Sequence, residues 1–149
     1  MTISTSTDRP DETTSWMLAF AAWLVAAMST ASALFLSEVM EYTPCLLCWY
    51  QRIFMFPLVL VLAIGLFPFD ARVVRYALPL AIGGWLVGVY HVLLMVGYIP
   101  KSAVPCAQGV PCAQAQVTWF GFVTIPLLSV AAFSLITVFL LVLRNRSSE

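Results

Sequence analysis

Four long apolar stretches dominate the pattern of hydrophobic and polar positions along the chain. They run from about Ser15 to Leu36, Cys45 to Phe67, Tyr76 to Ile99 and Val117 to Leu143. A helix needs about 20 predominantly apolar residues to cross the hydrocarbon core of a membrane, so each stretch is long enough. The stretches are continuous and do not alternate with a period of two, which argues against a membrane β-barrel. The pattern therefore predicts four transmembrane helices.

The connections between these stretches are short, which sets the expected architecture. They cover about residues 37–44, 68–75 and 100–116. Short loops make consecutive helices antiparallel neighbours, so we expect an all-α integral membrane protein. Residues 1–149 are predicted to form a single domain, a four-helix transmembrane bundle. Residues 1–13 are rich in Ser and Thr and are expected to be a flexible tail. The first stretch is too long, and its leader too acidic, for a typical cleaved signal peptide.

The placement of Lys and Arg predicts the orientation of the bundle. The side that holds both termini and the second loop carries Arg9, Arg72, Arg75, Arg144 and Arg146. The opposite side carries Lys101, with Arg52 near the same interface. Cytoplasmic loops carry an excess of basic residues, so we expect both termini in the cytoplasm. The loops at 37–44 and 100–116, with all four cysteines on or beside them, then lie outside.

The composition agrees with lipid as the main solvent of this chain. Hydrophobic residues make up 62% of the sequence and charged residues 9%, whereas a soluble domain has about 25% charged residues. This excludes an ordinary cytosolic globule, and the high hydrophobicity excludes disorder. The formal net charge is +0, so no basic field is present to bind nucleic acid.

Cys45 and Cys48 form a C-x-x-C pair at the predicted start of the second helix. Thr43 is a good N-cap and Pro44 suits the first helical position, so both cysteines are expected in the first turns. Free backbone amides and the positive end of the helix dipole favour a thiolate there, and the thiolate is the reactive form. We therefore expect a reactive pair at the outer face of the membrane.

Arg52 and His91 interrupt two of the apolar stretches. An ionisable residue inside the membrane is costly and is by default a candidate for function. Arg52 lies one helical turn after Cys48, where its charge favours a thiolate. At 1.5 Å per residue, Arg52 and His91 lie about 10 and 12 Å below the outer ends of their helices. The alternatives are an arginine that snorkels to the interface and a histidine bonded to a neighbouring helix. Gly84 and Gly88 are expected to serve close helix packing.

Cys106 and Cys112 form the second pair, in the last outer loop. Each stands in one copy of a direct repeat, Val-Pro-Cys-Ala-Gln, and Gly109 separates the two copies. A disulfide across this gap would close a small exposed loop, and exposed disulfides are the exchangeable kind. The proline before each cysteine keeps the chain extended and accessible.

Three interpretations of the four cysteines compete. Structural disulfides are usual in an oxidising compartment, but a C-x-x-C bridge closes too small a ring to constrain much chain. Zinc motifs more often pair two short C-x-x-C knuckles, so no metal is expected. Redox exchange explains both pairs: one takes two electrons from a soluble thiol protein, and the other passes them to an acceptor dissolved in lipid. A membrane quinone is the natural two-electron acceptor.

The segment from Pro44 to Arg52, P-C-L-L-C-W-Y-Q-R, resembles the signature of the DsbB family of disulfide-bond formation proteins. His91 and the segment from Phe120 to Pro126 match the family as well, and the resemblance covers about residues 16–143. The loop cysteines are closer together than in many members, which resembles the compact, BdbC-like variety of Gram-positive and related bacteria. The vitamin K epoxide reductase-like family, whose members are also four-helix quinone and disulfide enzymes, has its two pairs in the reverse order.

The resemblance implies a quinone-dependent protein-disulfide oxidoreductase of the bacterial cytoplasmic membrane. Such a membrane thiol oxidase reoxidises a DsbA-like thioredoxin-fold partner outside the cytoplasm. It then passes two electrons to ubiquinone or menaquinone. The alternative is a structural four-span membrane protein with ordinary extracytoplasmic disulfides, in which the cysteines contribute only stability.

The resemblance also implies a role for each site residue. Cys106 would form the mixed disulfide with the partner, and Cys112 would exchange with Cys45. Cys48 would meet the quinone as a thiolate. The residues expected near the quinone oxygens are Arg52 and His91.

Overall fold

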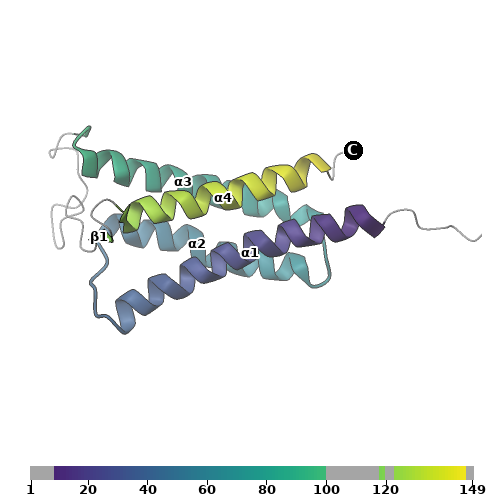
Figure 1. Cartoon of the computed structure of the whole chain (residues 1–149), viewed down its shortest axis with the longest axis horizontal. Coiled ribbons are helices and arrows are strands. Elements are labelled where there is room, and N and C mark those ends of the chain that lie inside the picture. Colours follow the sequence, from purple (N-terminus) through teal and green to yellow (C-terminus); the bar gives the residue numbers. More distant parts are fainter. Residues whose placement is uncertain (1–8, 100–117, 120–122, 147–149) are drawn as a thin grey trace, which may run out of the picture.

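The computed structural model describes residues 9–99, 118–119 and 123–146, and within them four long helices form the fold (Figure 1). The helices are α1 (Arg9–Glu38), α2 (Leu46–Leu66), α3 (Val74–Val96) and α4 (Ile125–Arg146). A short 3-10 helix, η1 (Ala71–Val73), leads directly into α3. All four long helices have the length and apolar composition needed to cross a membrane. The predicted all-α membrane fold is confirmed.

Two boundaries differ from those expected from the sequence. Helix α1 begins at Arg9, inside the segment expected as a flexible tail. Helix α4 begins at Ile125 and not near 117, because a short antiparallel hairpin precedes it: β1 (Thr118–Trp119) pairs with β2 (Val123–Thr124). Apolar composition alone does not separate a buried strand from the start of a helix. Pro126 marks the true start, since proline fits the first helical turn.

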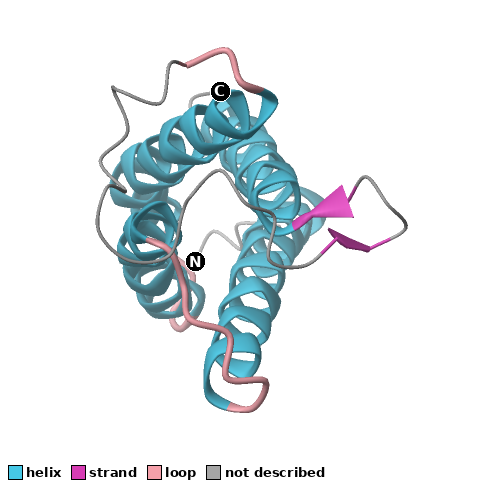
Figure 2. Ribbon diagram, turned by 90° about the vertical axis from the view of Figure 1, so that its left-hand side faces the viewer, coloured by secondary structure: helices cyan, strands magenta, loops and turns pink. Residues whose placement is uncertain are grey.

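The helices form an antiparallel bundle in which each helix packs against two neighbours. The packed pairs are α1 with α2, α2 with α3, α3 with α4, and α4 with α1, and Figure 2 shows this arrangement from one end. The start of α1 and the end of α4 lie at the same end of the bundle (Figure 1). The start of α2, the end of α3 and the start of α4 lie at the other end, where the site is built.

The core combines small residues on two helices with large ones on α4. Phe133 of α4 is fully buried, and a Cβ atom added to Gly84 of α3 would overlap its ring. A Cβ atom added to Gly88 would lie 2.9 Å from Cγ2 of Val130. The predicted packing role of both glycines is confirmed, because only glycine lets α3 approach α4 this closely. On α1 the buried positions are also small: Ala19, Ala22 and Ala26.

Large apolar side chains also cover the outside of the bundle. The exposed fraction is 66% for Leu60 and 74% for Ile64, both on α2, and 74% for Phe67, the C-cap of that helix. Soluble monomers rarely expose contiguous apolar surface on this scale. The exterior is therefore suited to contact with lipid chains.

Candidate active site

Cys45 is the N-cap of α2, and its own sulfur accepts the capping hydrogen bond. Its backbone is extended, with φ −70° and ψ 168°, and the Cys48 backbone N–H donates to Cys45 Sγ at 3.3 Å. The predicted cap at Thr43 is therefore wrong by two residues: the first helical bond runs from Trp49 N to Cys45 O. Thr43 has the better intrinsic capping tendency. The helix nevertheless starts after Cys45, because the Cys45 sulfur accepts the hydrogen bond from the free backbone N–H of Cys48.

The two thiols of the C-x-x-C pair lie side by side at the end of α2. Cys45 Sγ and Cys48 Sγ are 2.7 Å apart, and both cysteines are free. Cys45 is buried, with 6% of its surface exposed, whereas Cys48 is only partly buried. A disulfide between them needs only a small movement of the side chains. The pair is thus placed to alternate between dithiol and disulfide.

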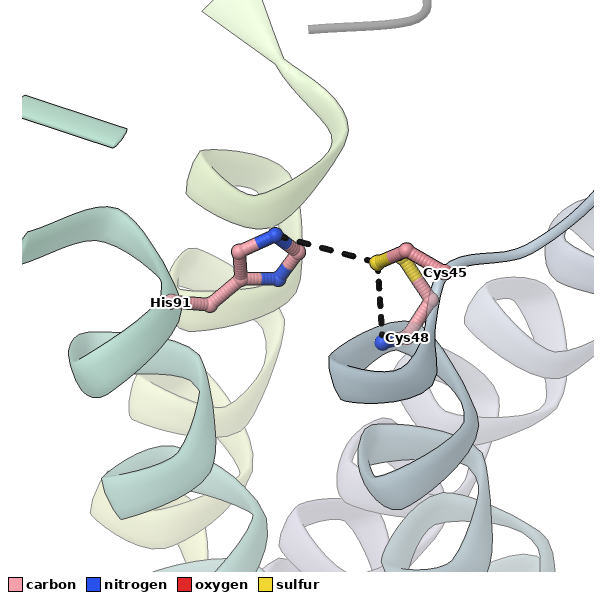
Figure 3. Close-up of side chains that lie close together, drawn as sticks. All are labelled: Cys45, Cys48 and His91. Carbon is pink, nitrogen blue, oxygen red and sulfur yellow. Dashed lines mark hydrogen bonds between the residues drawn. The ribbon is translucent and has the colours of Figure 1, made fainter. Parts of the chain in front are cut away.

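His91 of α3, the helix next to α2, faces the pair (Figure 3). Its Nε2 lies 3.9 Å from Cys45 Sγ, and its Nδ1 lies 3.3 Å from Nε2 of Gln51, one turn into α2. The amide nitrogen of glutamine only donates hydrogen bonds. In the neutral tautomer that fits this contact, Nδ1 accepts from Gln51 and Nε2–H points at the sulfur of Cys45. Both His91 and Gln51 are buried, with 2% and 7% of their surface exposed.

Cys45 precedes the membrane-spanning part of α2, and its surroundings stabilise its thiolate. The hydrogen bond from the Cys48 side chain lowers the pKa of the Cys45 thiol well below its ordinary value of 9.0. Burial opposes this shift, whereas the hydrogen bond from His91 and the backbone N–H of Cys48 add to it. These contacts favour the thiolate form of Cys45.

Arg52 lies on the other side of the pair and reaches helix α1. Its guanidinium donates to the carbonyl oxygen of Ala33 at 2.8 Å and to Ser37 Oγ at 3.3 Å. It also lies over the Trp49 ring, with Cζ 5.4 Å from the ring centroid. Both hydrogen-bond partners are in the last turns of α1, where the helix dipole is negative. These contacts offset part of the cost of a charge in the membrane.

A cavity of about 360 Å³ lies beside Cys48, between α1, α2 and α4. Gln51 and Arg52 supply the amide and the charge in its wall, and the rest is mostly apolar. Met28 of α1 and Leu128 of α4 line the cavity and are each more than half exposed. The cavity therefore opens on the lipid-facing surface between these two helices.

The structure brings together four of the six residues predicted for the site. Cys45, Cys48 and His91 have donor atoms within 4.8 Å of one another, and Arg52 shares the cavity wall with Cys48. His91 contacts Cys45 and is not among the described residues that line the cavity. The remaining two residues, Cys106 and Cys112, lie outside the described residues.

Gln51 is the site residue that the sequence alone did not reveal. In the sequence, Gln51 stands out only as part of the P-C-L-L-C-W-Y-Q-R segment. Its role depends on the contact with His91, which is 40 positions away in the chain. The signal available in the sequence was the register: Gln51 follows Cys48 by three residues, so it lies on the same face of the helix.

Fold and site together define a four-helix membrane protein with a reactive dithiol at one end of the bundle. Residues 13–143 match the family model described as disulfide bond formation protein DsbB. The chain is 47% identical to the "Probable disulfide formation protein" of Metapseudomonas resinovorans, over 89% of this chain and 93% of that protein. It is 44% identical to "Disulfide bond formation protein C" of Bacillus subtilis (strain 168), over 87% and 94% of the two chains.

The chain belongs to the DsbB family of disulfide bond formation proteins. It is a multi-pass membrane protein and acts as a membrane thiol oxidase. This activity implies a thiol–disulfide partner. The family is generally linked to quinone. The predicted resemblance to the compact, BdbC-like variety is confirmed by relatives named disulfide formation protein C. No solved structure matches the chain.

Proposed function

We propose that this protein reoxidises a DsbA-like thioredoxin-fold disulfide donor outside the cytoplasm and passes the two electrons to ubiquinone or menaquinone. The observation that carries the proposal is the cavity at the dithiol: it has Cys48 and Arg52 in one wall and opens toward lipid. The relatives' names as disulfide formation proteins support the same reaction.

The residues around the cavity fit the head group of a quinone. A flat, mostly apolar ring with two carbonyl oxygens suits an apolar cavity with a few polar groups. The Arg52 guanidinium and the Gln51 amide supply hydrogen-bond donors for those oxygens. The exposed rim at Met28 and Leu128 gives an apolar tail a way out into the bilayer. When bound, a quinone supplies an acceptor for two electrons and two protons.

Cys45 and Cys48 supply those electrons. The thiol proton of Cys45 leaves first, and that of Cys48 leaves as the disulfide forms. The two sulfurs together lose two electrons, and one sulfur–sulfur bond is made. His91 stabilises the negative charge on Cys45 before this bond forms, because its Nε2–H faces that sulfur.

Cys106 and Cys112 connect this pair to the partner protein in our proposal. A thiolate of the reduced partner attacks Cys106 of a Cys106–Cys112 disulfide and forms the mixed disulfide. The partner's second thiol resolves it, so the partner leaves oxidised and both loop cysteines are reduced. Cys112 then attacks Cys45 of the Cys45–Cys48 disulfide, and Cys106 displaces Cys45. This restores the loop disulfide and leaves Cys45 and Cys48 as thiols.

The charges of the bundle support one orientation in a bacterial cytoplasmic membrane. One end of the bundle holds the start of α1 and the end of α4 (Figure 1). The basic residues at this end include Arg72, Arg75, Arg144 and Arg146. The excess of basic residues on cytoplasmic segments supports placing this end inside. Cys45 and Cys48, at the opposite end, then face the oxidising side.

The test is turnover by the purified protein with a reduced thioredoxin-fold donor and a soluble quinone analogue. We expect loss of quinone absorbance, abolished by Cys48→Ser and retained by the control variant Thr137→Ser, a change on α4 outside the lining of the cavity. Absence of quinone reduction by the unaltered protein would overturn the proposal. The structural alternative predicts that serine at all four cysteines changes only stability.

A further inference from the structure

A second cavity, of about 570 Å³, lies at the end of the bundle away from Cys45 and Cys48. Three arginines line it: Arg72 of η1, Arg75 of the first turn of α3, and Arg144 of the last turn of α4. Its wall continues along α3 over the apolar residues Leu78, Pro79 and Ile82. The cavity therefore joins a cationic rim to an apolar wall.

The positions of Arg72 and Arg75 are unfavourable without an anion. Both lie at the N-terminal end of the η1–α3 segment, where the helix dipole is positive, and neither helix has an acidic residue in its first turn. Cations are normally disfavoured at this end of a helix. Between Glu41 and Glu149 the sequence holds one acidic residue, Asp70. Its carboxylate accepts the Arg72 backbone N–H at 2.8 Å as the N-cap of η1.

We propose that this cavity binds the phosphate group of an anionic phospholipid, with an acyl chain along the wall of α3. Arginine side chains and a helix N-terminus are both suited to phosphate, and basic pockets between membrane helices bind anionic head groups. Ile82 is 41% exposed on the outside of the bundle, where a lipid chain can cover it. Soluble phosphate shares the head-group chemistry but leaves the apolar wall uncovered.

The test is lipid binding by the full-length protein in neutral detergent. Dioleoylphosphatidylglycerol and dioleoylphosphatidylcholine are titrated separately, and bound lipid is counted by native mass spectrometry. We expect phosphatidylglycerol to bind more tightly than phosphatidylcholine. The double variant Arg72→Gln/Arg75→Gln should weaken phosphatidylglycerol binding about tenfold or more, because two charge contacts are lost. If this variant does not fold, Arg75→Gln is compared with Arg75→Lys, which keeps the charge and should keep most of the binding.

Arg146→Gln is the matched control, because Arg146 is in the same last turn as Arg144 but does not line the cavity. It removes one positive charge, as Arg75→Gln does, and should leave phosphatidylglycerol binding nearly unchanged. Equal binding of the two lipids by the unaltered protein would overturn the proposal. So would an equal loss in Arg146→Gln and the single variant Arg75→Gln, since the arginines would then act only through total charge. Displacement of phosphatidylglycerol by inorganic phosphate alone would overturn the assignment to a lipid.

Discussion

His91 Nε2 lies 3.9 Å from the sulfur of Cys45, at the N-cap of α2, whereas the Arg52 guanidinium donates to Ala33 and Ser37 of α1. His91 and Arg52 therefore act on different parts of the site. His91 stabilises the first thiol, and Arg52 stands in the wall of the cavity beside the second. Both were expected at the quinone oxygens; the geometry supports that role more directly for Arg52.

The contact between Gln51 and His91 predicts a shift in the pH dependence of Cys45. Gln51→Leu removes the donor to Nδ1 of His91, so the ring no longer holds its proton toward the sulfur. The hydrogen bond from His91 contributes to lowering the pKa of Cys45, so losing it should raise that pKa. The midpoint of Cys45 alkylation against pH, followed by peptide mass spectrometry, should move to higher pH.

His91→Ala should produce a shift in the same direction, and the double variant should add little to it. A role of Gln51 in stability alone would lower the unfolding temperature and leave the alkylation midpoint in place. That outcome would contradict the proposed link from Gln51 through His91 to Cys45.

Arg52→Ala should weaken quinone use more than thiol exchange. A hydrogen bond to a charged group is worth about 1.5–3 kcal/mol, so we expect the apparent KM for quinone to rise by about tenfold or more. Disulfide exchange between the loop and the partner does not pass through Arg52 and should keep its rate. An unchanged KM would refute the placement of Arg52 at the quinone.

Ser37→Ala is the control for Arg52, because it removes one anchor of the guanidinium and leaves the charge in place. The carbonyl of Ala33 still holds Arg52 at 2.8 Å. We expect KM to change much less than in Arg52→Ala. A loss as large as that of Arg52→Ala would mean that packing of α1 against α2, and not the charge, controls quinone use.

Cys106→Ser should abolish the covalent complex with the partner protein. In the proposed order of exchange, the partner attacks the sulfur of Cys106 in the loop disulfide, so the substitution removes both that sulfur and the disulfide. The complex is trapped with a partner that lacks its resolving cysteine and is seen on a non-reducing gel. A complex that persists through Cys112 would reverse the assignment of the two loop cysteines.

Gly84→Ala should destabilise the bundle. The added methyl group would overlap the buried ring of Phe133, and overpacking of this kind costs about 1–3 kcal/mol. Gly88→Ala should cost less, because its methyl group meets Val130 Cγ2 at 2.9 Å. Thermal unfolding in detergent measures the order of the two. Equal stability of the Gly84→Ala and unaltered proteins would contradict the close approach of α3 to α4.

The sequence predicted the bundle well because its strongest signal is hydrophobic length, which lipid makes decisive. It located Cys45, Cys48, Arg52 and His91 because a charge or a C-x-x-C pair is conspicuous in an apolar helix. It did not predict Cys45 as the N-cap of α2, because the intrinsic N-cap preference is higher for Thr43. The contacts of the Cys45 sulfur with Cys48 and His91 favour Cys45 in the folded protein.

The side-chain contacts between helices could not be predicted from the sequence, and the reason is physical. The anchoring of Arg52 at Ala33 and the bond from Gln51 to His91 depend on how the helices are rotated, which hydrophobicity alone leaves open. The hairpin before α4 was missed because Thr118 to Thr124 is apolar enough to continue a helix.

The most direct test isolates the reaction of the dithiol with quinone from exchange with the partner. The variant Cys106→Ser/Cys112→Ser is reduced, freed of reductant and mixed with a soluble quinone analogue, and quinol and remaining thiols are counted. We predict one quinol formed and two thiols lost per chain, and neither when Cys48→Ser is added. Quinol formation that persists without Cys48, or no quinol from the intact dithiol, would contradict the account.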